Sequence, residues 1–137
     1  MWQIYAILSA IFAALTAIFA KVGVANVNSN LATAIRTLVI LFITWAIVFA
    51  TVPLREVKDI SKQTLLFLVF SGLATGMSWL FYFKALQIGH ASKVAPVDKL
   101  SVVFTIILAF VFLGEPLSLK VVFGGLLILA GSLVLMF

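Results

Sequence analysis

The sequence predicts an all-α fold: a polytopic integral membrane protein whose five transmembrane helices form a bundle. Hydrophobic residues make up 65% of the 137 positions and charged residues only 9%, whereas a soluble domain needs roughly a quarter of its residues charged to cover its surface. The apolar residues form five stretches, each close to the ~20 residues that cross a ~30 Å hydrocarbon layer. Lipid cannot satisfy the open edge of a sheet, so these stretches predict helices.

Polar residues between the stretches set the expected limits of the helices, within one domain that covers residues 1–137. We expect helices over residues 2–20, 31–52, 64–86, 94–113 and 119–137. Asn30 is the expected N-cap of the second helix and Ser118 that of the fifth, because their side chains accept a hydrogen bond from a free backbone N–H. Pro53 stops the second helix, and a hydrophilic linker follows it.

The fourth helix carries one marker near each end. Gly114 directly follows this helix and suits the left-handed conformation that is common after a helix C-terminus. Pro96 lies in the first turns, where its missing N–H either costs little or produces a kink.

Composition excludes several classes of function. The chain has no cysteine, which excludes disulfides, thiol catalysis and Cys-ligated metals, and its single histidine, His90, excludes a histidine cluster. There is no Ser-His-Asp set, no metal-ligand spacing and no phosphate-binding loop. We therefore expect no enzyme, no cofactor and no metal. The net charge of +5 indicates membrane-flanking basic residues or an anion path, with the lipid bilayer rather than nucleic acid as the partner.

The basic residues leave the orientation in the membrane open. Five spans place the hydrophilic linker and the loop before the fifth helix on one side, with four basic residues: Arg55, Lys58, Lys62 and Lys120. The other side has five: Lys21, Arg36, Lys84, Lys93 and Lys99. Such a small difference allows either one orientation, with the linker cytoplasmic, or dual topology with antiparallel pairs.

Three charged residues lie inside predicted spans. Arg36 is six residues into the second helix, and Asp98 and Lys99 are at a similar depth in the fourth. Such a charge costs about 2.5–3.5 kcal/mol on insertion scales. An Arg36–Asp98 pair that faces the bundle is the leading interpretation, with either a structural role or a substrate or proton role. Lys84 and Lys99 either reach the headgroups or border the solute path.

The third helix carries small and aromatic residues on one side. Gly72, Gly76, Trp79 and Phe83 follow one another at steps of four, three and four, and Tyr82 lies three beyond Trp79. Two interpretations stay open: a solute cavity, or tight packing with an interfacial aromatic belt. We expect a polar vestibule near Trp79 and Tyr82, where surplus positive charge favours a carboxylate or phosphate on the solute.

The C-terminal half carries a family pattern. The run KALQIGHASKVAPVDKLSVVFTIILAFVFLGEPLSLKVVFGGLLILAGSLVL combines a polar loop, a proline-bearing helix, a Gly-Glu turn and a glycine-rich last helix. The residues that carry the pattern are Ser92, Pro96, Gly114, Glu115, Gly124, Gly125 and Gly131. This run resembles the EamA domain of the drug/metabolite transporter superfamily, and the N-terminal half matches that domain mainly in length and helix count.

The resemblance implies a transporter of small solutes that works by alternating access. Longer relatives carry two such domains, so a lone five-helix copy is expected to form a homodimer, parallel or antiparallel, through small-residue faces. The small multidrug resistance relatives use a glutamate in their first helix, and the first helix here has no acid.

We therefore expect a multi-pass protein of the cytoplasmic membrane that acts as a secondary transporter of a small metabolite. The alternatives are a multidrug or organic-cation exporter and a non-transporting membrane scaffold subunit.

Overall fold

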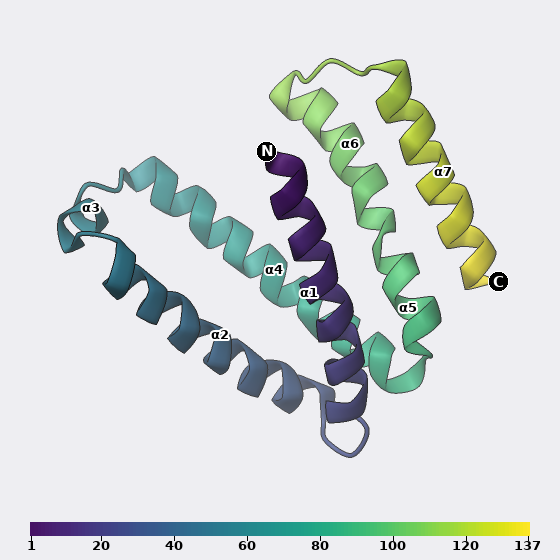
Figure 1. The fold of residues 1–137 in the computed structure, drawn as a ribbon, viewed down its shortest axis with the longest axis horizontal. Coiled ribbons are helices and arrows are strands. Elements are labelled where there is room, and N and C mark those ends of the chain that lie inside the picture. The colour runs from purple at the N-terminus through teal and green to yellow at the C-terminus, as the bar shows by residue number, and fades with distance from the viewer. The chain divides into compact units, whose positions relative to one another are not determined.

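The computed structural model describes residues 1–137, except for the side chains of Leu54 and Lys58. Seven helices follow one another along the chain (Figure 1): α1 Trp2–Gly23, α2 Ser29–Thr51, α3 Leu54–Lys58, α4 Lys62–Ile88, α5 Ala91–Asp98, α6 Leu100–Leu113 and α7 Leu119–Met136. Five segments are long and apolar enough to cross a membrane, with α5 and α6 together forming the fourth. The all-α, five-span fold class predicted from the sequence is confirmed.

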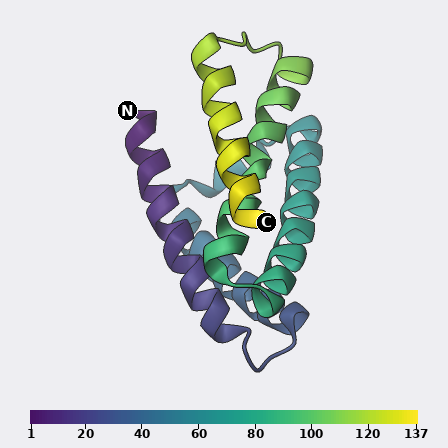
Figure 2. The same ribbon diagram turned by 90° about the vertical axis from the view of Figure 1, so that its right-hand side faces the viewer.

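The chain divides into two compact units, of which the first contains residues 1–20 and 88–137. Within it, α6 and α7 run side by side in opposite directions, joined by residues 114–118 (Figures 1 and 2). Gly114 has the expected left-handed conformation, with φ of 66°, and ends α6. The Ser118 hydroxyl caps α7 by accepting a hydrogen bond from the Val121 N–H at 3.3 Å. A Cβ on Gly125 would lie 3.1 Å from Ile106 Cδ1, so α7 packs closely on α6.

The second unit contains residues 21–87, in which α2 and α4 are connected through α3. The N-cap expected for α2 at Asn30 is wrong. Asn28 is the cap, since its side-chain oxygen accepts a hydrogen bond from the Asn30 N–H at 2.9 Å. The turn offers chemically equivalent asparagines two residues apart, and the backbone becomes helical at Ser29, which leaves Asn30 inside the first turn.

Six threonine hydroxyls inside the spans are satisfied by the helices that carry them. They donate to the carbonyl of the residue four positions earlier, at 2.7–2.9 Å: Thr33, Thr37, Thr44, Thr51, Thr75 and Thr105. At these six residues no hydroxyl proton is left for lipid to satisfy.

Few of the described side chains are buried. The buried apolar ones are Ala17, Ala20, Val24, Phe83 and Leu86, whereas large apolar residues along all five spans are exposed. An apolar exterior would be costly in water, but lipid tails are as apolar as these side chains. The surface therefore fits a chain whose solvent is the bilayer.

Candidate functional site

Arg36 lies against the aromatic face of α4 in the second unit. Its guanidinium carbon is 4.3 Å from the ring centre of Trp79 and 5.2 Å from that of Phe83. The two aromatic residues are four positions apart, so they share one face of α4. Both distances are within the ~6 Å over which a cation is attracted to an aromatic ring, an attraction of about 0.5–2 kcal/mol. The site therefore holds a positive charge inside a membrane span.

One hydrogen-bonding group of Arg36 is unused. Its Nη1 atom is buried and has no hydrogen-bond partner among the described residues. A guanidinium carries five N–H donors and no acceptor. A buried donor without a partner costs about 1–3 kcal/mol, and more on a charged group. The aromatic contacts compensate part of this cost, and an acceptor at Nη1 would compensate the rest.

The polar neighbours of Arg36 on α2 do not supply that acceptor. The Thr33 hydroxyl donates to the Ser29 carbonyl at 2.9 Å, and the Thr37 hydroxyl donates to the Thr33 carbonyl at 2.8 Å. A hydroxyl that donates keeps lone pairs that are able to accept, but neither threonine accepts from Nη1 of Arg36, which has no partner among the described residues.

Lys21 and Gln87 make long-range hydrogen bonds at the C-terminal end of α4. Lys21 Nζ donates to the carbonyl of Leu86 at 2.6 Å, and Gln87 Nε2 donates to the carbonyls of Val24 at 3.2 Å and Val27 at 2.9 Å. Lys21 thus places its charge on the last turn of α4, where the helix dipole favours a cation. Together these bonds fix the loop between α1 and α2 against α4, and so set where α2 begins.

Gln87 was not identified from the sequence as part of this region. A signal for it exists, because Trp79, Phe83 and Gln87 are separated by four residues each and share one helix face. An amide at the last turn of a helix is able to satisfy backbone carbonyls of the neighbouring loop. The partners themselves, Val24 and Val27, depend on packing between distant segments.

Of the other residues expected along the solute path, two lie beside this cluster. The Tyr82 ring meets the Phe83 ring edge-on, with centres 6.5 Å apart. Lys84 is exposed, and its Nζ lies 3.4 Å from Gln87 Oε1, at the same helix end. The second unit therefore brings together Arg36, Trp79, Tyr82 and Phe83. Lys84 is exposed nearby, at the C-terminal end of α4.

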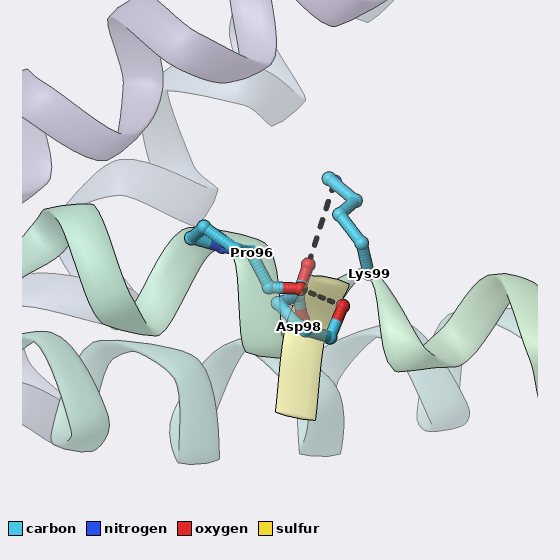
Figure 3. Close-up of polar contacts among 4 residues, drawn as sticks. Pro96, Asp98 and Lys99 are labelled. Atoms are coloured by element: carbon cyan, nitrogen blue, oxygen red, sulfur yellow. Dashed lines mark hydrogen bonds and ion pairs between the residues drawn. The ribbon is translucent and has the colours of Figure 1, made fainter. Parts of the chain in front are cut away.

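The fourth span is broken, and its break lies in the first unit (Figure 3). The span was expected to be one helix over residues 94–113; instead α5 begins at Ala91 and ends at Asp98, and α6 begins at Leu100. Pro96 is therefore in the interior of α5, where it removes the backbone hydrogen bond to the Ser92 carbonyl. The interruption follows three residues later at Lys99, whose backbone stays right-handed helical with φ of −69° and ψ of −6°, and the two helices together form one span over Ala91–Leu113. The carbonyl of Pro96 accepts hydrogen bonds from the Lys99 N–H at 3.0 Å and from the Ser132 hydroxyl of α7 at 2.9 Å.

Asp98 and Lys99 sit at this break. Their side chains approach to 3.6 Å, with 38% of Asp98 and 56% of Lys99 exposed. An ion pair between two such exposed neighbours adds little stability. The Arg36–Asp98 pair expected from the sequence would join the two units, and it stays a prediction.

A charged group in each of two spans and a span interrupted close to a proline are features of membrane proteins that move solutes. Comparison with known proteins agrees: the EamA-like transporter family matches residues 1–137, and the chain belongs to that family. A Sinorhizobium protein named "Uncharacterized transporter in cobO 3'region" is 56% identical over 134 residues, which cover 98% of this chain and 95% of the relative. No solved structure matches the chain. The family resemblance recognised in the sequence is confirmed.

Proposed function

We propose that this membrane transporter is a secondary transporter, which moves a small metabolite across the cytoplasmic membrane by alternating access as a homodimer. The family match supports transport as the activity. The absence of cysteine, of a second histidine and of any catalytic motif in the sequence supports a protein that moves its solute without chemical change.

The broken fourth span is the observation that carries this proposal. Many transporters build their solute site from discontinuous helices near the middle of the membrane, because the break releases backbone groups toward a cavity and allows the halves to tilt. Here the carbonyl of Pro96 points to Ser132 on the neighbouring helix, and Asp98 places a charge at the same point (Figure 3).

The homodimer is supported by an unfilled small-residue face on α4. A Cβ built on Gly72 or Gly76 meets nothing within 4 Å. A second helix can approach such a face closely. Since longer relatives of the family resemble two copies of such a domain, a second copy of this chain is the partner we propose for the face, in parallel or antiparallel orientation.

Arg36 disfavours the alternative of an organic-cation exporter. A fixed positive charge with an unused donor repels cationic solutes and attracts anionic ones, and α1 contributes no acid to offset it. The scaffold alternative predicts no solute movement at all.

Solute flux in proteoliposomes tests the proposal. The purified protein is reconstituted in phosphatidylcholine and offered labelled anionic, zwitterionic and cationic metabolites in parallel. We expect saturable uptake of at least one solute above protein-free liposomes, and faster exchange when the same unlabelled solute is inside. Folded, reconstituted protein that moves none of the three classes would contradict transport and favour the scaffold.

A further inference from the structure

We infer that Arg36 binds an anionic oxygen group, a carboxylate or a phosphate, of the transported solute, and that Trp79 and Phe83 hold its guanidinium in position. This inference rests on the proposed function and names the solute class at its site.

The guanidinium of Arg36 lies against two aromatic rings and also has an N–H group without an acceptor. The rings of Trp79 and Phe83 lie 4.3 Å and 5.2 Å from its central carbon and hold the charge in place, while Nη1 has no hydrogen-bond partner among the described residues. A guanidinium presents its N–H groups in a planar fork, which matches the two oxygens of a carboxylate or phosphate. The residue is thus oriented, charged and short of an acceptor.

The unit that holds Arg36 has no acid near it in the sequence. Its two acids, Glu56 and Asp59, lie in and directly after α3, beyond the far end of α2. From Arg36 to Thr51, α2 alone extends about 22 Å at ~1.5 Å per residue. The pair with Asp98, in the other unit, stays a prediction, and Nη1 of Arg36 has no acceptor among the described residues. The acceptor that we infer is an anion from outside the chain.

Two sources can supply the same chemistry: a dissolved solute and the phosphate of a lipid headgroup. We assign the site to the solute, because Arg36 lies seven residues into α2 and its guanidinium is held against the rings of Trp79 and Phe83 on α4. The experiment below tests the two sources separately.

Trp79 provides a direct optical probe, since its ring lies over the charged group. The chain has three tryptophans, and replacing Trp2 and Trp45 by phenylalanine leaves Trp79 as the only one. This parent variant is placed in phosphatidylcholine nanodiscs and titrated with acetate and with inorganic phosphate at constant ionic strength. Tetramethylammonium chloride serves as the cationic control.

We expect a saturable change in Trp79 emission with at least one of the two anions and none with tetramethylammonium. In the same background, Arg36→Gln should weaken the apparent affinity at least tenfold, and Arg36→Lys, which keeps the charge but loses the fork, should give an intermediate loss. The matched control is Arg55→Gln, which removes the other arginine and should behave as the parent. Arg36→Lys carries the test alone if Arg36→Gln does not yield folded protein.

Equal anion responses in the parent and in both Arg36 variants would overturn the inference, as would the absence of any saturable anion response. A change in emission that appears only when phosphatidylglycerol replaces phosphatidylcholine would assign the site to a headgroup and overturn it too.

Flux separates this inference from the proposed function. Uptake of an uncharged or cationic solute that Arg36→Gln leaves intact would keep the transporter and overturn the anion site. Saturable, Arg36-dependent anion binding with no flux of any solute would support the anion site and overturn transport.

Discussion

Arg36 carries a buried donor without a partner inside a membrane span, and its contacts with Trp79 and Phe83 offset part of the energetic cost. The spacing of Trp79 and Phe83 predicts that they share a helix face, and the depth of Arg36 in its span predicts a functional or paired role. That Arg36 lies over this face depends on how α2 packs against α4. Local spacing does not contain that information, because it fixes faces within a helix and not the rotation of one helix against another.

Removing the closer ring should weaken anion binding at Arg36. Trp79→Leu keeps an apolar side chain but eliminates a cation–aromatic contact of about 0.5–2 kcal/mol, which corresponds to an increase of about 2- to 30-fold in the KM for an anionic solute. Trp45→Leu is the control, since Trp45 contacts Phe49 instead. Equal KM values in the two variants would contradict a positioning role for Trp79.

Replacing Asp98 distinguishes its two interpretations. Asp98→Asn removes the charge at nearly constant shape, and the pair with the exposed Lys99 contributes little stability. We expect folded protein whose flux is lost or uncoupled from a proton gradient, measured by uptake with and without an imposed pH difference. Loss of folded protein would instead indicate a structural role, and unchanged flux in both Asp98→Asn and Arg36→Gln would exclude both residues from the transport cycle.

At the scale of helices, the ends at Gly114 and Ser118 were predicted, whereas the N-cap of α2 lies two residues before the predicted one and the break in the fourth span was not placed. Gly114 and Ser118 act as expected because a left-handed glycine and a serine cap need only their own neighbours. Pro96 was compatible with a helix start or with a kink, and the choice depends on where the helix begins. Because α5 begins at Ala91, Pro96 falls inside the helix, and the interruption follows three residues later at Lys99.

Pro96→Ala should repair the break and impair the cycle. Alanine restores the backbone N–H and favours a continuous helix. With spin labels on cysteines placed at Ala91 and Leu113, the inter-label distance should increase toward that of a straight 23-residue span, about 33 Å at ~1.5 Å per residue. Solute flux should fall in the same variant.

Pro116→Ala, in the loop after α6, is the matched control and should change neither the distance nor the flux. A Pro96→Ala protein with the original distance distribution and full flux would contradict the role given to the break.

At the scale of the whole molecule, apolar surface remains along all five spans, and the open glycine face of α4 is where we expect the second copy. Gly72→Ile combined with Gly76→Ile should lower the dimer fraction in mild detergent without unfolding the chain, since a Cβ at either position meets nothing within 4 Å. Ala74→Ile, on a different face of the same helix, is the control. An unchanged dimer fraction, or a monomer with full flux in the unmodified protein, would contradict the proposed assembly.

The central claim is that this chain moves an anionic solute past Arg36, and initial uptake rates in phosphatidylcholine proteoliposomes test it most directly. The unmodified protein, Arg36→Gln and Arg55→Gln are reconstituted at equal density and offered the same labelled carboxylate and phosphate compounds. We predict saturable uptake by the unmodified protein and by Arg55→Gln, with at least a tenfold lower rate at limiting solute for Arg36→Gln. Equal uptake by all three proteins, or uptake no greater than that of protein-free liposomes, would contradict the claim.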